Sequence, residues 1–150
     1  MYKTNSNREI TYNGREYTND IKSINNEYNI NSIDELFSIL LEVWCKDTTY
    51  PSCKLDYNYD NDPSYGQCAI TAILVHDIFG GTIHKIKVDG GTHYFNKINN
   101  HYIDLTSDQF TLYNILLDYE DNVEKTKDEC LKNEDTLNRY NLLKELVKKH

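Results

Sequence analysis

The sequence predicts an α+β fold in which a central buried helix packs on an antiparallel sheet. Residues 66–79 are apolar on nearly every side, which is typical of a helix in the middle of a domain. Three segments with strand-forming residues follow at 82–88, 92–98 and 101–105, separated by Asp89-Gly90-Gly91 and Asn99-Asn100. The chain of 150 residues fits a single domain with a sizeable core.

The first 31 residues are polar and predict one short hairpin over residues 9–18. Asn13-Gly14 suits a tight type I′ turn, and Ile10, Tyr12 and Tyr17 favour strands on either side of it. An isolated two-stranded hairpin is marginally stable, so we expect it to dock on the rest of the domain.

A first helix is predicted to begin after Ser32 and to end near Lys46. Ser32 and Glu35 form a capping-box pattern ahead of a broad apolar face. Residues 47–65 are rich in turn formers and predict a long loop. A loop of that length inside a compact domain is usually functional or disordered.

The segments after the sheet predict two more helices. Residues 107–119 carry regularly spaced apolar side chains, and residues 134–149 form an amphipathic pattern with lysines near the end, which suits the helix dipole. Residues 120–133 between them are acidic and weakly patterned.

Charge and hydropathy exclude some classes of partner. The formal net charge is −8, from 24 acidic and 16 basic residues, so we expect no general binding to nucleic acid. No apolar run approaches the length of a membrane span, and residues 1–5 lack an apolar signal core. We therefore expect a cytoplasmic protein without a membrane partner, with reduced thiols at Cys45, Cys53, Cys68 and Cys130.

Cys68 is the best candidate for a nucleophile, because it lies close to the start of the central helix. A helix N-terminus lowers the pKa of a thiol, and the thiolate is the reactive form. Unpaired N–H groups of the first helical turn can hold a developing oxyanion. Gly66, two residues earlier, permits close approach of a substrate backbone.

His93 and Asp104 are the candidate base and its orienting partner. If Asn99-Asn100 is a two-residue turn, Ile98 pairs with His101, and His93 and Asp104 become diagonal neighbours on one face of the sheet. A slip of one residue would put them on opposite faces. His84 is expected on the face opposite His93, since Asp89-Gly90-Gly91 is taken as a three-residue turn.

Structural roles are the alternative for each of these residues taken singly. A cysteine on an apolar helix is usually a small buried hydrophobe, and a strand histidine is usually hydrogen-bonded or exposed. The order of a helix-start cysteine, a strand histidine and a next-strand aspartate favours a catalytic arrangement. The cysteine spacing disfavours a zinc site, so we expect no metal and no cofactor.

Four residues are candidates for oxyanion or substrate binding: Gln67, Trp44, Tyr65 and Gly66. Gln67 could donate a side-chain hydrogen bond or could cap the helix. Trp44 could line the site, but an aromatic at the end of an apolar stripe is more often core. Tyr65 belongs to a tyrosine-rich loop that could form a rim over Cys68 or a lid on apolar surface.

Several blocks of sequence together resemble the bacterial YunG family. They are Trp44, Thr48-Thr49-Tyr50-Pro51, Asn61-Asp62-Pro63-Ser64-Tyr65-Gly66-Gln67-Cys68-Ala69-Ile70-Thr71-Ala72, Phe79-Gly80-Gly81, His93-Tyr94-Phe95-Asn96 and Asp104-Leu105-Thr106-Ser107-Asp108-Gln109-Phe110. The resemblance covers about residues 36–112. It implies a family-like core over about 32–119, with an N-terminal hairpin extension over 1–31 and a C-terminal helical extension over 120–150.

The order of Cys68, His93 and Asp104 is also similar to that of papain-like and transglutaminase-like cysteine enzymes. That similarity implies a core of the same kind, with Cys68 as nucleophile, His93 as base and Asp104 as orienting residue. Papain-type proteases have an oxyanion glutamine six residues before the cysteine, where this chain has Asp62. An oxyanion hole would then use the Cys68 backbone N–H with Gln67 or Trp44.

Two functions from different classes follow. The first is a cysteine-dependent hydrolase or acyltransferase that acts on an amide, ester or thioester of a small-molecule or protein substrate. The second is a non-catalytic binding or inhibitor protein, of the kind that a phage or mobile element encodes, which sequesters a small molecule or a host protein.

Overall fold

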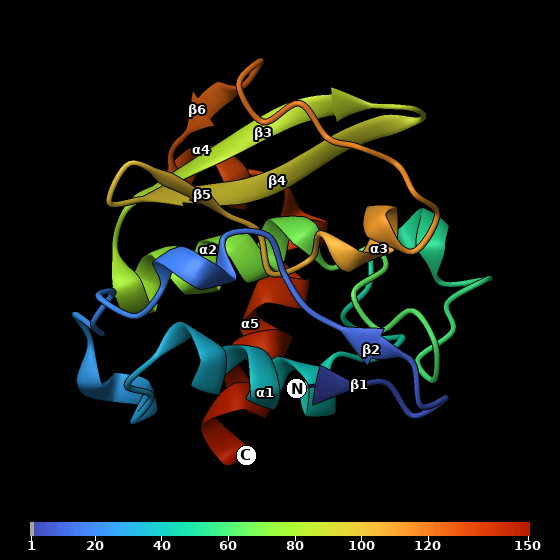
Figure 1. Cartoon of the computed structure of the whole chain (residues 1–150), viewed down its shortest axis with the longest axis horizontal. Helices are drawn as coiled ribbons and strands as arrows, with labels where there is room; N and C mark the ends of the chain where they lie inside the picture. The colour runs from blue at the N-terminus through green and yellow to red at the C-terminus, as the bar shows by residue number, and fades with distance from the viewer. Residues whose placement is uncertain (1) are drawn as a thin grey trace.

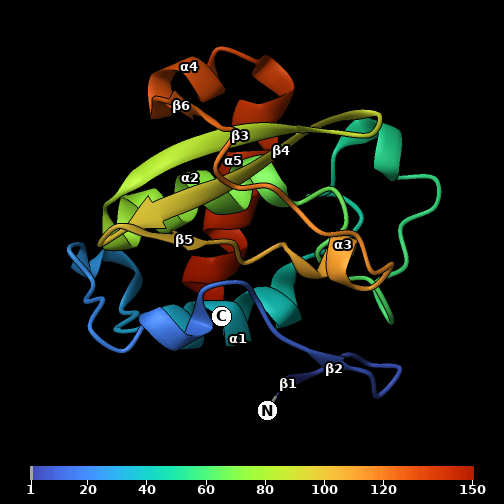
Figure 2. The same ribbon diagram turned by 45° about the horizontal axis from the view of Figure 1, so that its top comes forward.

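A computed structural model describes residues 2–150 and shows a layered α+β arrangement (Figure 1). Helix α2 (Cys68–Phe79) lies between a four-stranded sheet and helix α1 (Ile33–Val43). The long C-terminal helix α5 (Glu134–Lys149) packs against both α1 and α2, as the turned view in Figure 2 also shows. Apolar side chains of α1, α2, α5 and the sheet form one buried core around α2.

The sheet is antiparallel and has the order β5-β4-β3-β6. Its strands are β3 (Thr82–Val88), β4 (Gly91–Ile98), β5 (His101–Ile103) and β6 (Val123–Lys125). The three consecutive strands confirm the predicted meander, although β5 ends two residues early. Strand β6 pairs with the outer edge of β3, in a segment whose weak pattern predicted no element.

The two predicted helices around the core form for the expected reasons. In α1, the Ser32 side chain accepts a hydrogen bond from the Glu35 N–H, and the helix ends at Val43, before Lys46. Helix α2 begins at Cys68 with Gln67 as its N-cap, two residues later than predicted. Eight of its residues are buried, which agrees with an apolar surface on nearly all sides.

The predicted hairpin over residues 9–18 is wrong. Strand β1 (Tyr2–Lys3) pairs instead with β2 (Glu9–Ile10), and Gly14 precedes the 3₁₀ turn η1 (Arg15–Tyr17). A Cβ on Gly14 would lie 2.3 Å from the Tyr102 carbonyl oxygen. The glycine therefore serves a close approach to β5, and residues 11–18 pack on the domain instead of pairing with each other.

The predicted helix over residues 107–119 is reduced to α3 (Asp108–Thr111). Asn114 has a positive φ of 58°, which ends helical geometry, and Tyr113, Ile115 and Leu116 are exposed. The chain then crosses the outer face of the sheet, where the Tyr119 ring packs edge-on against Phe95. The helix prediction failed because its apolar residues do not form one buried helix face: some are exposed, and Tyr119 packs on the sheet from a segment without helical structure.

Short elements complete the chain. Two further 3₁₀ turns are η2 (Asn26–Tyr28) and η3 (Pro51–Cys53), and helix α4 (Lys127–Leu131) begins with a complete capping box at Thr126 and Glu129. Helix α5 has the predicted bounds, and both of its terminal lysines lie in the last turn. Within residues 2–150, no helix combines the length and the apolar character that crossing a membrane requires.

Candidate active site

Cys68 is the first residue of α2 and its side chain is half-buried. The N–H groups of a first helical turn have no acceptor within the helix, so those around Cys68 are available to a negatively charged group. The thiol lies on the wall of a cavity of about 1000 Å³, which His93 also lines. The nucleophile candidate and the base candidate therefore face the same space.

The predicted register between β4 and β5 is confirmed. Ile98 pairs with His101, and Asn96 pairs with Ile103. Strand β5 ends there, and Asp104 forms an isolated bridge with Asn13 of the N-terminal segment. His93 Nε2 lies 2.6 Å from Asp104 Oδ2, and both side chains are only 1% exposed.

Two further residues fix the carboxylate of Asp104. Thr106 donates to Oδ1 through its backbone N–H at 3.1 Å and its hydroxyl at 3.3 Å. Tyr119 donates its hydroxyl to Oδ2 at 2.8 Å, the oxygen that faces His93. Together with the contact from His93, these hydrogen bonds hold the buried carboxylate in one orientation.

Tyr119 is the residue that the sequence analysis missed at this site. It belongs to a segment predicted as helix, so no pattern placed it over the sheet. Its ring packs against Phe95 at 4.8 Å between centroids and stacks with Tyr102 at 5.8 Å. Only the crossing of residues 112–122 over β4 brings its hydroxyl to Asp104.

The environment shifts the pKa values of His93 and Cys68 in opposite directions. Burial alone would lower the pKa of His93, but the charge of Asp104 and the hydrogen bond to it raise that pKa to about 10. Burial alone would raise the pKa of the Cys68 thiol. Hydrogen bonding with His93 and its positive charge outweigh that effect, with help from the Tyr94 backbone, and lower the pKa.

The contact between the thiol and the imidazole is not an ideally aligned hydrogen bond. His93 Nδ1 is buried and has no partner of good geometry among residues 2–150, since Nε2 is occupied by Asp104. Cysteine–histidine pairs are often loose before substrate binds and tighten in the complex. The Phe110 ring, edge-on to His93 at 4.7 Å, limits movement of the imidazole.

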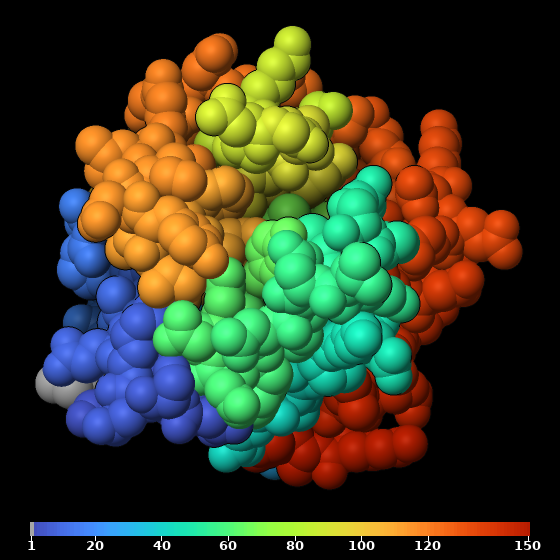
Figure 3. Space-filling model, turned by 90° about the vertical axis from the view of Figure 1, so that its right-hand side faces the viewer, coloured from blue at the N-terminus to red at the C-terminus, as the bar shows by residue number. Residues whose placement is uncertain are grey.

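The segment over residues 125–139 lines one part of the cavity. Three further parts of the chain surround its mouth (Figure 3). They are the loop over residues 50–66, the turn between β3 and β4, and the segment around α3, drawn in green, yellow-green and orange. Tyr65 and Gly66 both lie on this wall. Gly66 has φ of 74°, and a Cβ there would lie 2.1 Å from Thr49 Oγ1, so the position requires glycine.

Gln67 and Trp44 are oriented away from the expected oxyanion position, so this prediction is corrected. The buried Gln67 side chain donates its Nε2 to the Cys45 carbonyl at 3.0 Å. Trp44 is 1% exposed and donates its indole N–H to Thr71 Oγ1 at 3.1 Å. Both donors are committed to the packing of α2 against the chain before it, which leaves backbone N–H groups as the remaining donors.

His84 lies on the same face as His93, so the prediction of opposite faces is wrong. Val88 pairs with Gly91, which makes Asp89-Gly90 a two-residue turn and shifts the register by one residue. His84 then lies opposite Phe95, and the Phe95 ring stacks between the two imidazoles. Hydrogen bonds to Thr82 and Asn122 hold His84, which gives it a structural role.

No cluster of three or more histidine, cysteine, aspartate or glutamate side chains over residues 2–150 has the geometry to hold a metal ion.

Comparison with known proteins relates most of the chain to one family. No solved structure matches it. Over 48 residues it is 52% identical to the uncharacterized protein YunG of Bacillus subtilis (strain 168), a stretch that covers 32% of this chain and 42% of that protein. The chain thus matches less than half the length of this curated relative. The model of the YunG protein family matches residues 32–150, which include the C-terminal helices as well as the site. The chain belongs to the YunG family.

Proposed function

We propose that this protein is a cysteine-dependent hydrolase or acyltransferase that acts on an amide, ester or thioester. The observation that carries the proposal is the buried line from Asp104 through His93 to Cys68, which opens into a cavity at the start of α2. The opposite pKa shifts of Cys68 and His93 favour a thiolate beside an imidazolium.

The proposed reaction has two steps. The Cys68 thiolate attacks the carbonyl carbon, and the N–H groups of the first turn of α2 stabilise the oxyanion. His93 then gives its proton to the leaving amine, alkoxide or thiolate, and an acyl-enzyme remains. Water or an amine attacks the thioester while His93 takes its proton, which releases the acyl product and restores the thiolate.

A papain-like or transglutaminase-like core is part of this proposal. The similarity rests on the order of the three residues and on a helix-start cysteine that packs against antiparallel strands carrying the histidine. The side chain six residues before the cysteine is Asp62 rather than glutamine. We therefore propose a hydrolase or transferase with a backbone-based oxyanion hole rather than an endopeptidase of the papain type.

The first test is the rate at which iodoacetamide labels Cys68 as a function of pH, read by mass spectrometry. We expect an apparent pKa well below the free-thiol value of about 8.5. In His93→Ala that pKa returns toward the free value, because the imidazolium that stabilises the thiolate is gone. Cys130 provides an internal reference, since burial raises the pKa of its thiol.

The second test uses p-nitrophenyl acetate as a general acyl donor. We expect a burst of p-nitrophenol with acetylated Cys68, and neither signal in Cys68→Ala. The rate of the burst should fall on both sides of a pH plateau, because acid protonates the thiolate and alkali removes the proton that His93 donates. Two results together would refute the proposed enzyme: labelling of Cys68 that is slow and has the same rate in wild type and His93→Ala, and the absence of a burst. They would favour the non-catalytic binding protein instead.

A further inference from the structure

Asp62 is a buried carboxylate on the wall of the Cys68 cavity. It lies in the turn that leads into α2, where its backbone N–H donates to Asn58 and its carbonyl accepts from Tyr65. The side chain is only 7% exposed, and Oδ1 has no hydrogen-bond partner among the described residues 2–150. A buried carboxylate without a partner is costly, so such groups usually have a use.

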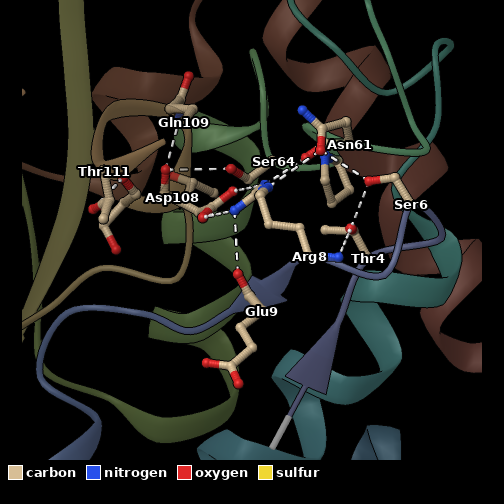
Figure 4. A network of polar contacts seen from close by, with 12 residues as sticks. Thr4, Ser6, Arg8, Glu9, Asn61, Ser64, Asp108, Gln109 and Thr111 are labelled. Atoms are coloured by element: carbon tan, nitrogen blue, oxygen red, sulfur yellow. Dashed lines mark hydrogen bonds and ion pairs between the residues drawn. The ribbon is translucent and has the colours of Figure 1, made fainter. Parts of the chain in front are cut away.

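The cation closest to pairing with Asp62 is committed elsewhere. Arg8 donates to both carboxylate oxygens of Asp108, at 2.8 and 2.7 Å, and also to the Asn61 backbone carbonyl (Figure 4). Burial raises the pKa of Asp62 to about 6, helped by the negative charge of Asp108 and opposed by Arg8. Above that pH the carboxylate is mostly ionised, and among residues 2–150 it has no salt-bridge partner.

The other charged groups on the cavity wall are paired or at least partly exposed, including Asp89, which is exposed, and Lys85, which is half-buried and has no salt-bridge partner among residues 2–150. Lys125 pairs with Glu129 at 3.1 Å, and Arg139 pairs with Asp135 at 2.8 Å. Asp56 is exposed and accepts from the Tyr65 hydroxyl at 3.4 Å. Asp62 thus differs from these neighbours in being charged, buried and unpaired at once.

We propose that Asp62 binds a cationic group of the substrate, an ammonium or a guanidinium, while the substrate carbonyl meets Cys68. The inference of a substrate carbonyl rests on the proposed function, whereas the cation site stands on Asp62 itself. A cation with N–H donors supplies a hydrogen bond to the carboxylate on the cavity side and the charge that burial otherwise leaves uncompensated. The preferred substrates are therefore amine- or guanidine-bearing acyl compounds.

The test uses Cys68 itself as the reporter. Two methanethiosulfonate reagents, one with a 2-aminoethyl group and one with a neutral methyl group, react with the thiolate, form a mixed disulfide and release methanesulfinate. The measured quantity is the ratio of their second-order rate constants at Cys68, followed by mass spectrometry at pH 8. Taking the ratio cancels any change in the reactivity of the thiol itself.

We expect Asp62→Asn to lower the preference for the aminoethyl reagent by about tenfold, the size expected for loss of one nearby charge in a partly buried site. The matched control is Asp56→Asn, which removes the same charge from the exposed rim and should change the ratio by less than about twofold because solvent screens it. Asn has the shape of Asp, and within the described residues 2–150 the Asp62 side chain makes no hydrogen bond that its replacement would break. Asp62→Ser serves as a second variant with the same expected loss.

An unchanged ratio in both Asp62 variants would overturn the cation site. An equal fall in Asp62→Asn and Asp56→Asn would overturn it as well, since the preference would then come from the overall acidity of the rim. Failure of the proposed function is distinguishable, because an unactivated Cys68 would give slow absolute rates with an ordinary thiol pKa while the ratio still reports on Asp62.

Discussion

Two walls of one cavity hold their carboxylates in opposite ways. On the strand wall, which His93 lines, the Asp104 carboxylate lies buried behind the imidazole and receives contacts from His93, Tyr119 and Thr106. On the loop wall, residues 56–66, the Asp62 carboxylate has an oxygen without a partner among residues 2–150. The Asp104 carboxylate, whose two oxygens both have hydrogen-bond partners, is suited to hold an imidazole in place. The Asp62 carboxylate, which has an oxygen without a partner, is suited to bind a group from outside.

Asp104→Asn should have the largest effect on this contrast. An amide cannot match the charge that orients and stabilises the His93 imidazolium, so we expect the p-nitrophenyl acetate burst to slow by about a hundredfold or more. In Asp62→Asn, the same isosteric change, the loss in burst rate should be at least tenfold smaller than in Asp104→Asn, because this ester carries no cation for Asp62 to bind. Equal losses in the two variants would show that the walls do not differ in role.

Gly14→Ala tests how the N-terminal segment supports the strand wall. Gly14 has φ of 88°, and its added Cβ would lie 2.3 Å from the Tyr102 carbonyl oxygen, so we expect a loss of about 1–3 kcal/mol in the free energy of urea unfolding. Gly90→Ala is the matched control. Its φ is 82°, but its Cβ would meet no atom within 4 Å among the described residues. Equal costs would contradict a close approach to β5.

Tyr119→Phe should sharpen the picture of Asp104 with a smaller effect. The ring contacts remain, but the hydroxyl donor to Oδ2 is lost, and we expect the burst to slow roughly fivefold, or about 1 kcal/mol. The negative charge of Oδ2 then acts on His93 alone, so the pKa of His93 should rise. The alkaline limb of the plot of burst rate against pH should therefore move to higher pH. Tyr102→Phe, whose hydroxyl bonds Glu120 instead, should leave that limb in place.

Leu116→Ser should have the smallest effect. Leu116 is 96% exposed in the segment that crosses from the loop side to the sheet, so its replacement should change the free energy of unfolding by no more than about 0.5 kcal/mol. The control Leu40→Ala, at a fully buried position in α1, should cost about 2–5 kcal/mol by the same urea measurement. A large cost at Leu116 would favour the buried helix that the sequence predicted.

Local patterns determined much of the architecture. The all-round apolar segment 66–79 forms α2, and the capping signal at Ser32 begins α1. The two-residue turn at Asn99-Asn100 pairs Ile98 with His101, which gave the diagonal contact between His93 and Asp104 in advance. These features depend on hydrogen bonds and on hydrophobic periodicity between residues that are near each other in sequence. The amino-acid sequence alone is therefore enough to predict them.

Only the tertiary structure decided where distant segments meet. Gly14 serves a contact with Tyr102 rather than a hairpin turn, and Tyr119 reaches Asp104 because residues 112–122 cross the sheet instead of forming a helix. Asp62 likewise lacks a salt-bridge partner among residues 2–150 because Arg8 pairs with Asp108, which is farther from Arg8 in sequence than Asp62 is. Local propensity is weak beside the burial of apolar surface and the pairing of buried charges, and both of those are settled between residues far apart in the chain.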